Sequence, residues 1–448
     1  MGTMPVFDPR AVIEGRTPGR TRVGLIVGII IAVFCALVAL AVDVLESLSG
    51  GHSVMPFFTA LPFALLPVPL LVAAVLFVDR LEPEPRVNLV FAFLWGAGIA
   101  ALFAAIINTA GLEFITQPAL GNTTGEYISA TFGAPVVEET LKGLVLVGLV
   151  WRRRQEFDGP TDGIIYAAMV GLGFAMMENI GYYIDALIRP VVGGARLLEV
   201  TFVMRGVLSP LAHPMFTSMT GIGAAYAASH RRAWWAVPLG WLAAMLLHGI
   251  WNGLTVFGLA GIGAAYGILF CVFVGLIAVL VADRRRIIAL IWRFLPLYAP
   301  TGLVTIEDVR MLSTLRGRRL ARNWARATGG MTAAAAIGDY QLAATELALL
   351  HQRAERGVID HQRFAGRQQA LLGLMQVARG AFLRRMPTPP PPPWAAQGTS
   401  GFARVHAFAA PMPPPPQGYR PGGYPALGYP PPGYPPPDYG PPAAGQGR

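Results

Sequence analysis

The chain has 448 residues, of which 54% are hydrophobic and only 13% are charged, and its mean hydropathy is +0.50. A soluble globular domain carries about a quarter charged residues, so this composition excludes a soluble single-domain enzyme and a protein disordered throughout; it favours several apolar spans in a membrane. The formal net charge of +10 requires no nucleic-acid partner, because the arginines lie at the ends of the apolar runs, where they orient spans in a bilayer.

Apolar runs long enough to cross a bilayer, which takes about 20 residues, recur along the first two thirds of the chain. They lie at 23–44, 56–78, 87–109, 132–150, 161–184, 203–229, 233–257 and 260–282. The fourth run is less apolar than the others because it contains two glutamates and the chain's only lysine. We therefore predict an all-α, polytopic bundle of about eight spans over residues 23–282, preceded by a short cytoplasmic segment at 1–22.

The arginines predict the orientation of these spans. They cluster before the first run and after the second, fourth, sixth and eighth runs, whereas the connections after the first, third and seventh runs contain none. Arginine and lysine are retained on the cytoplasmic side of a membrane. The alternation therefore predicts a multi-pass membrane protein with both termini in the cytoplasm.

Past residue 283 the chain changes character. Residues 283–385 mix Arg, Ala, Leu and Gln with helical spacing, which predicts a small cytoplasmic helical region. Residues 386–448 are rich in Pro, Gly and Tyr, and a segment of this composition cannot bury a core. We expect a disordered tail, and favour a merely solvated segment over a binding site for a protein partner.

Polar residues occur inside four consecutive apolar runs, where each costs several kcal/mol on insertion and indicates function. They are Glu138, Glu139 and Lys142 in the fourth run, Glu178 and Asn179 in the fifth, His213 in the sixth, and His248 and Asn252 in the seventh. With a rise of about 1.5 Å per residue, all four groups are expected roughly 9–15 Å below the outer surface. A common depth is what a single shared site requires.

The residue types at this site suit hydrolysis. A glutamate can take a proton from water and return it to the leaving amine, and a histidine–asparagine pair can stabilise a developing oxyanion. This mechanism needs no cofactor. The alternative is a zinc site, in which His213, His248 and Glu178 hold Zn²⁺ with an activated water. A second alternative is a transporter or binding protein that uses the same charges, although no inverted repeat is visible.

The four motifs also resemble a known family when they are taken in order. They read Glu138-Glu139-x-x-Lys142, Phe174-x-x-x-Glu178-Asn179, His213 and His248-x-x-Trp251-Asn252. This order resembles the PrsW family of intramembrane proteases, which is related to the type II CAAX prenyl endopeptidases of the CPBP superfamily. The resemblance spans roughly residues 60–282. It implies an endopeptidase that cleaves a membrane-anchored protein, such as an anti-sigma factor, on the outer side.

The resemblance also implies roles for individual residues. Glu138 and Glu139 correspond to the paired catalytic glutamates, one of which activates water. His213 and His248 fall at the essential histidine positions, and Asn252 falls at the asparagine of the oxyanion site. We place Glu178, Lys142 and Asn179 in supporting positions. Because the CAAX branch usually has a histidine where this chain has Glu178, a prenyl-protein substrate is disfavoured.

Overall fold

The computed structural model describes residue 12 and residues 23–80, 83–154, 157–188, 196–230 and 232–383. Within these ranges nearly every residue lies in a helix or a short turn, and no strand occurs. The predicted all-α class is confirmed. The predicted N-terminal segment, apart from Val12, and the proline-rich tail lie outside the described residues.

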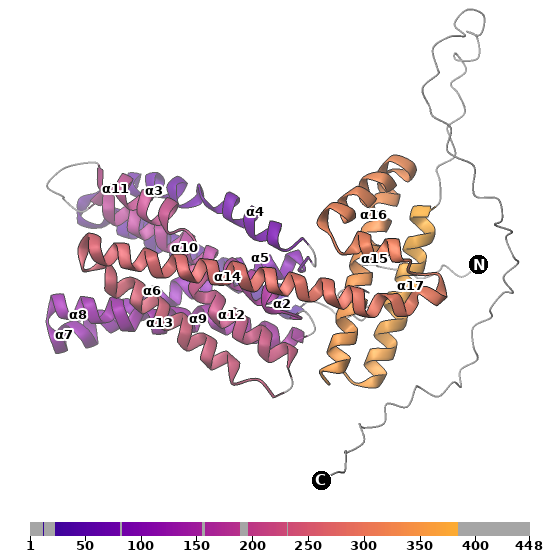
Figure 1. Cartoon of the computed structure of the whole chain (residues 1–448). Coiled ribbons are helices and arrows are strands. Elements are labelled where there is room, and N and C mark those ends of the chain that lie inside the picture. The colour runs from indigo at the N-terminus through magenta and orange to yellow at the C-terminus, as the bar shows by residue number, and fades with distance from the viewer. Residues whose placement is uncertain are drawn as a thin grey trace, which may run out of the picture. The chain divides into compact units, whose positions relative to one another are not determined.

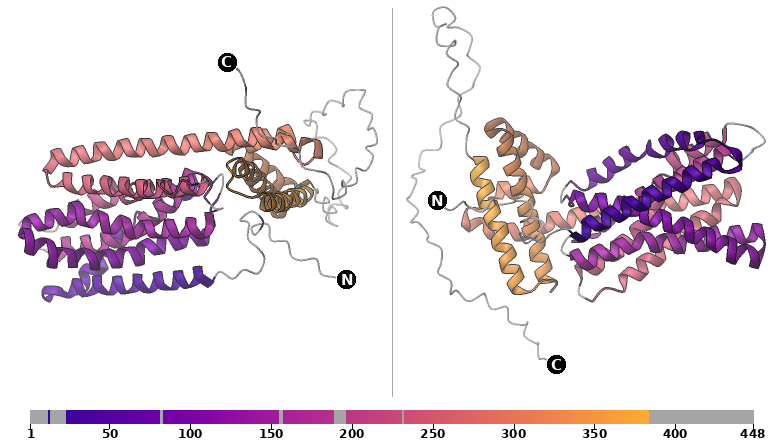
Figure 2. Two further views of the ribbon diagram at one scale, coloured as in Figure 1. Left: turned by 90° about the horizontal axis from the view of Figure 1, so that it is seen from below. Right: turned by 180° about the vertical axis from the view of Figure 1, so that it is seen from behind.

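The helices of the first half form long rods that lie side by side (Figures 1 and 2). They are α2 (Val23–Leu48), α3 (Met55–Leu65), α4 (Val68–Val78), α5 (Arg86–Leu94), α6 (Ala101–Gly111), α7 (Gln117–Leu120), α8 (Asn122–Ile128) and α9 (Ala134–Arg153). The helices α3 and α4 lie end to end in one rod, and α5, α6 and α7 lie end to end in another. Short 3₁₀ and π-helical segments join several of them: η1 (Ser49–Gly51), η2 (Trp95–Ala100), η3 (Leu112–Thr116) and η4 (Ser129–Gly133). Most of the stretch between the third and fourth predicted spans is therefore helical, and the chain turns at Gly121, whose φ is 79°.

The second half of the bundle holds α10 (Pro160–Ile188), α11 (Arg196–Phe202), the π-helix η6 (Val203–Leu208), α12 (Ala212–Ser229), α13 (Ala236–Thr255) and α14 (Gly258–Phe294). The sixth predicted span is not one continuous helix. It breaks at Ser209, which precedes Pro210 and has φ −125° and ψ 32°. Proline disfavours helical geometry in the residue before it. As a result His213 lies in the first turn of α12 rather than in the middle of a helix.

Among the described residues, six helical segments are long and apolar enough to span a membrane by length and composition. Of the eight predicted spans, those containing α9 and α12 are the two without such a segment. Both helices carry the polar residues singled out above, and polar residues lower the hydropathy on which the criterion depends. A multi-pass membrane architecture is thus confirmed, and the count of eight stays a prediction.

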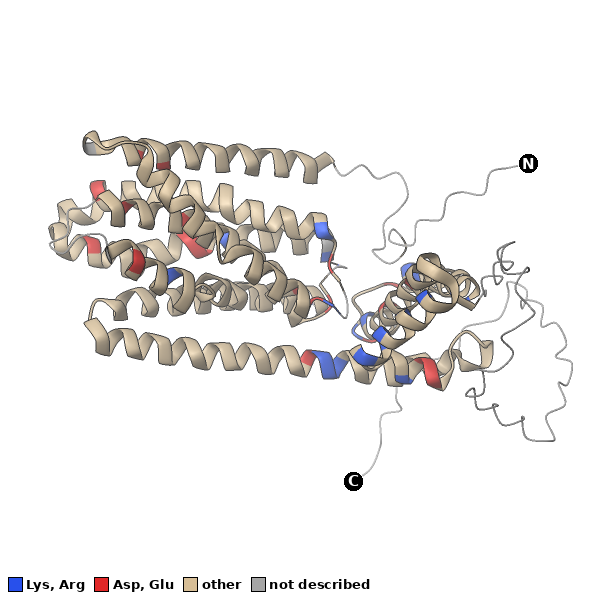
Figure 3. Cartoon of the chain, turned by 90° about the horizontal axis from the view of Figure 1, so that it is seen from above, with Lys and Arg blue, Asp and Glu red and all other residues tan. Residues whose placement is uncertain are grey.

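The helix α10 forms the centre of the bundle. Its most apolar window is 89% buried, whereas the corresponding window of α2 is 11% buried and that of α14 is 17% buried. The peripheral helices expose large apolar side chains such as Leu70 and Leu259. Figure 3 shows long uncharged stretches along the bundle helices, as lipid-facing surfaces require. The central position of α10 brings Glu178 into contact with residues of neighbouring helices.

Glycines allow α10 and α12 to pack closely. A Cβ atom on Gly163 would lie 2.1 Å from the carbonyl oxygen of Gly221, and a Cβ on Gly221 would lie 2.1 Å from that of Gly163. Nearer the predicted site, a Cβ on Gly171 would lie 2.6 Å from the backbone nitrogen of Pro214. Small residues at such crossings are typical of helix pairs in membranes. The glycines therefore determine how close His213 comes to α10.

We expect Gly171→Ala to lower the free energy of unfolding by about 1–3 kcal/mol, since the methyl group must push α12 away. Gly181→Ala is the matched control on the same helix, because a Cβ there meets no atom within 4 Å. Thermal unfolding of both variants in lipid nanodiscs measures the difference. Equal melting temperatures for the two variants would contradict the close crossing.

The region after the bundle is helical, as predicted. It contains the 3₁₀ helix η7 (Leu295–Thr301), α15 (Ile306–Leu312), α16 (Leu315–Glu355) and α17 (His361–Leu383), which share a core that includes Tyr340, Leu347 and Leu371. The helix α14 runs through residue 282, where the sequence predicted a boundary, and continues to Phe294. The charged residues of α14 begin at Asp283, so the change in composition occurs within one helix.

Candidate active site

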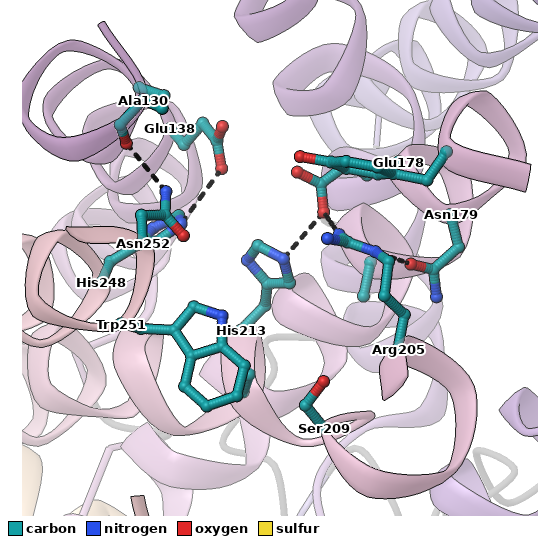
Figure 4. A pocket seen from close by; sticks show the side chains of 14 residues that line it. Ala130, Glu138, Glu178, Asn179, Arg205, Ser209, His213, His248, Trp251 and Asn252 are labelled. Carbon is teal, nitrogen blue, oxygen red and sulfur yellow. Dashed lines mark hydrogen bonds and ion pairs between the residues drawn. The ribbon is translucent and has the colours of Figure 1, made fainter. Parts of the chain in front are cut away.

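Polar side chains from four helices line one pocket (Figure 4). They are Glu138 of α9, Glu178 and Asn179 of α10, His213 of α12, and His248 and Asn252 of α13. The cavity has a volume of about 90 Å³, and a water molecule needs about 10–15 Å³, so several waters fit. Figure 4 shows Glu138 and His248 on one side, Glu178 on the other and His213 between them. The predicted convergence of these residues is thus present in the structure.

Lys142 joins the two adjacent glutamates of α9. Its Nζ atom lies 3.2 Å from Glu138 Oε2 and 3.0 Å from Glu139 Oε1, and its side chain is fully buried. The same ammonium lies 3.7 Å from the centre of the Phe174 ring, a cation–π contact. One lysine therefore partly neutralises two buried carboxylates.

His248 is held by Glu139. Its Nδ1 atom lies 3.1 Å from Glu139 Oε1 and its Nε2 atom lies 3.9 Å from Glu138 Oε2. An ionised carboxylate only accepts hydrogen bonds, so Nδ1 carries the proton and the Nε2 of a neutral ring is left as an acceptor. His248 therefore presents an acceptor nitrogen toward a carboxylate oxygen of Glu138.

His213 has a partner on each ring nitrogen. Its Nδ1 lies 3.0 Å from Lys142 Nζ, and its Nε2 lies 2.9 Å from Glu178 Oε2. An ammonium only donates, so Nδ1 accepts and Nε2–H donates to Glu178. The ring centres of His213 and His248 are 5.2 Å apart. The two histidines thus belong to one network rather than to separate pockets.

Arg205 of η6 completes the far wall of the pocket. Its Nη2 pairs with Glu178, its Nε donates to Asn179 Oδ1 at 2.8 Å, and its guanidinium lies 3.6 Å from the centre of the Tyr182 ring. Among the described residues, Arg205 and Lys142 are the cations that contact this group of carboxylates. Arg205 is not among the site residues predicted from the sequence. An arginine inside an apolar run is costly in a membrane, so its position could have indicated a role there.

Asn252 lines the pocket, but its amide group is partly engaged. Its Nδ2 donates to the backbone carbonyl of Ala130 in η4 at 2.9 Å. A π-helical segment offers main-chain carbonyls outside the regular α-helical pattern, and such segments are frequent at functional sites. Asn252 therefore ties α13 to η4 and keeps one amide hydrogen for the pocket.

Two contacts to the glutamates come from residues that the sequence did not single out. Asn108 of α6 donates from Nδ2 to Glu138 Oε1 at 3.2 Å, and Thr217 of α12 donates from Oγ1 to Glu139 Oε2 at 2.8 Å. Thr217 lies one helical turn after His213, so the i, i+4 spacing could have found it. Asn108 is an isolated amide in an apolar run, which by itself indicates little.

The pocket residues lie within a recognisable family match. The family model described as PrsW family intramembrane metalloprotease matches residues 84–281. Protease PrsW of Geobacillus kaustophilus (strain HTA426) is 30% identical over 182 residues, which cover 40% of this chain and 71% of that relative. The chain belongs to the PrsW family.

Two other relatives named Protease PrsW agree with this assignment. The PrsW of Oceanobacillus iheyensis (strain DSM 14371 / CIP 107618 / JCM 11309 / KCTC 3954 / HTE831) is 32% identical over 127 residues, or 28% of this chain and 54% of that relative. The PrsW of Clostridioides difficile (strain 630) is 29% identical over 143 residues, or 32% of this chain and 55% of that relative. The chain thus spans about half the length of these two relatives. No solved structure matches the chain significantly.

Membership of the PrsW family makes the chain a membrane-embedded peptidase, and the family description raises the question of a metal. Glu138, His213 and His248 each offer a ligand atom, and these atoms lie within 4.8 Å of one another. Two histidines and one glutamate form a donor set used by catalytic zinc sites. The residues therefore fit a zinc ion. In this cluster Glu138 takes the place that the sequence had given to Glu178.

Proposed function

We propose that this PrsW-family protein hydrolyses a peptide bond of a membrane-anchored protein with a water molecule activated next to Glu138. The observation that supports this most strongly is the pocket in which Glu138, Glu178, His213 and His248 meet from four helices. A hydrolase needs an acceptor for the proton of water and a place from which bulk lipid and solvent are excluded. Glu138 provides the acceptor, and Glu138, His213 and His248 are buried within the bundle.

The two glutamates are proposed to have different roles. Glu138 lines the pocket, whereas Glu139 does not and is fully buried among Lys142, Thr217 and His248. We assign the proton transfer to Glu138 and the orientation of His248 to Glu139. A carboxylate that fixes the second nitrogen of a histidine determines which nitrogen faces the reaction.

The geometry suggests where the reacting water lies. Glu138 Oε2 and His248 Nε2 are 3.9 Å apart, and both are acceptors, so a water between them can donate one hydrogen to each over about 2.8 Å. Its oxygen attacks the substrate carbonyl carbon while Glu138 takes a proton. Glu138 then returns that proton to the leaving amine as the C–N bond breaks. The remaining amide hydrogen of Asn252, on the pocket wall, is a donor for the carbonyl oxygen that becomes negative.

A metal-assisted form of the same reaction is the second candidate, because Glu138, His213 and His248 form a zinc-type donor set. These three residues would hold a zinc ion, which would supply Lewis-acid chemistry for the substrate carbonyl and the attacking water. In this form Glu139 and Glu178 would hold the second nitrogens of His248 and His213, as carboxylates beside metal-binding histidines commonly do. His213 Nδ1 would then give up its contact with Lys142 Nζ.

The metal-assisted form predicts that stringent chelation abolishes cleavage by the purified protein and that added Zn²⁺ restores it, whereas the metal-free form predicts that cleavage survives chelation. The physical reason is the donor set described above. Metal content measured by mass spectrometry before and after chelation establishes that the ion was removed. Full activity in demonstrably metal-free protein would leave water activation to Glu138 alone.

The proposed substrate is a single-span membrane protein, for which the family resemblance suggests an anti-sigma factor cut toward the outer side. The proposed location is the bacterial plasma membrane with both termini in the cytoplasm, supported by the arginine distribution. In this proposal residues 23–282 form the protease domain and residues 283–385 an accessory cytoplasmic region.

The function is tested with full-length protein and single-span model substrates in proteoliposomes, with fragments identified by mass spectrometry. We expect wild-type protein to cleave, and His213→Ala and His248→Ala to lose cleavage by about 10²-fold or more. Undiminished cleavage by both variants would overturn the proposed site. Absence of cleavage together with solute flux that depends on Glu178 would instead favour a transporter.

A further inference from the structure

The first half of α16 carries a basic and apolar surface that no contact within the described chain explains. Residues 315–331 contain five arginines and no acidic residue. The inner face of this segment is anchored: Arg318 donates to the Leu312 carbonyl and to Thr345 Oγ1, and Ala325 is fully buried. The segment therefore has a fixed orientation, and its outer face is a defined surface.

The outer face combines large apolar side chains with free arginines. Leu320 and Trp324 are 57% and 48% exposed, and their i, i+4 spacing puts them side by side on the helix. Arg316, Arg319 and Arg326 are exposed and have no ion pair or hydrogen bond with any described residue. With about 100° per residue, Arg319 and Arg326 lie along one edge of the apolar pair, and Arg316 lies between.

We propose that this face of α16, here called the α16 surface (Arg316, Arg319, Leu320, Trp324 and Arg326), docks onto an anionic lipid surface. The inference does not depend on the proteolytic function. A helix with Trp and Leu beside arginines lies in the interface of a bilayer, with its apolar side chains among the acyl chains and its cations at the phosphates. The absence of any carboxylate from 315–331 matches a negatively charged partner.

The chain also keeps this surface near a membrane. The helix α14 leaves the last predicted span at residue 282 and ends at Phe294, which is about 18 Å farther along its axis. It contacts the part of α16 that follows the kink at Gly330, where Arg286 bonds Gln352 and Arg293 pairs with Glu355. The first half of α16 packs on that second part, for example through Arg318 and Thr345. Tethering at such a distance turns docking into an intramolecular step with a high effective concentration. The arginine-rich ends of the spans predict that this side faces the cytoplasmic leaflet, which carries the anionic lipids.

The test uses the full-length protein with Cys35 and Cys271 replaced by Ser and an environment-sensitive fluorophore on Leu320→Cys. The matched control carries the fluorophore on Val377→Cys, an exposed position of α17 outside the α16 surface. Both proteins are placed in nanodiscs of phosphatidylcholine alone or mixed with phosphatidylglycerol, with a quencher on the upper acyl chain. We expect strong quenching at position 320 in the anionic discs and little at position 377.

Charge removal provides a second measurement. Each arginine near an anionic surface contributes about a fivefold factor, so Arg316→Gln, Arg319→Gln and Arg326→Gln together should weaken docking about a hundredfold. The label at position 320 should then respond like the label at 377. Arg363→Gln is the control, because Arg363 is an exposed arginine of α17 that pairs with Asp360. High salt should also weaken docking.

Three results would overturn the inference. The first is equal quenching at positions 320 and 377 in anionic discs. The second is quenching that the triple Arg→Gln variant retains in full. The third is a label at position 320 that is already shielded in detergent without lipid, which would show that another part of the chain or a second copy covers the α16 surface.

Discussion

Glu138→Gln is expected to lower the rate of peptide cleavage by about 10²–10⁴-fold, the usual contribution of a general base. The amide has nearly the shape of the carboxylate but cannot take a proton from water. Lys142 keeps its contact with Glu139 in this variant, so the protein should accumulate. The new amide nitrogen faces a donor, either Asn108 Nδ2 or Lys142 Nζ, so the unfolding temperature should fall slightly below that of the wild type. Single-turnover cleavage in proteoliposomes and thermal unfolding measure the two quantities separately.

The adjacent substitution separates the two glutamates. Glu139→Gln should also lose cleavage, because His248 loses the carboxylate that orients it, and it should unfold at a lower temperature than Glu138→Gln. Glu139 is fully buried and accepts hydrogen bonds from Lys142 and Thr217. In the glutamine variant an NH₂ group replaces one of the accepting oxygens, so one of these donors loses its acceptor. Glu126→Gln, the same change on exposed α8, is the control for both variants. Near-normal cleavage by Glu138→Gln would remove it from the proposed chemistry.

Lys142→Met is expected to lower the free energy of unfolding by about 3–5 kcal/mol, as happens when one partner of a buried ion pair is removed. The variant leaves Glu138 and Glu139 adjacent and buried without the ammonium that contacts both. Reduced accumulation in membranes should accompany the loss, because a change of this size is a large part of a protein's total stability.

A second substitution tests whether charge is the cause. The double variant Glu139→Gln/Lys142→Met removes one negative charge together with the positive one, so it should recover part of the lost stability. A purely steric effect of methionine would persist unchanged in the double variant. Unfolding temperatures of the two single variants and the double variant, compared as a cycle, distinguish these outcomes. Wild-type stability of Lys142→Met would show that the buried carboxylates need no cation.

The helical class and the convergence of the polar groups were both predictable from the sequence. Apolar runs of about 20 residues allow almost no structure other than helices, because lipid offers no partner for a main-chain hydrogen bond. Glu138, Glu178, His213 and His248 are too costly to face lipid, so they had to meet one another inside the bundle. The pocket that they share follows from this constraint.

Other features depend on how the helices are rotated and where they break. Periodicity did not show that η6 would bring Arg205 onto Glu178, because a π-helical turn shifts the register of the residues that follow. It also did not show that Glu138 rather than Glu178 would complete the cluster with the two histidines. Both carboxylates lie close to His213. Small differences in side-chain conformation therefore decide which of them joins the cluster.

The sequence by itself therefore determined that this protein spans a membrane and gathers its costly side chains at one site, since desolvation acts on each residue wherever it lies in the chain. The tertiary structure alone decided which glutamate faces the pocket and which one is enclosed around Lys142. That choice depends on the close approach of α10 and α12 at Gly171 and on the partners that Asn108 and Thr217 provide from other helices. These contacts join segments that are far apart in the chain, so they exist only once the helices have packed together.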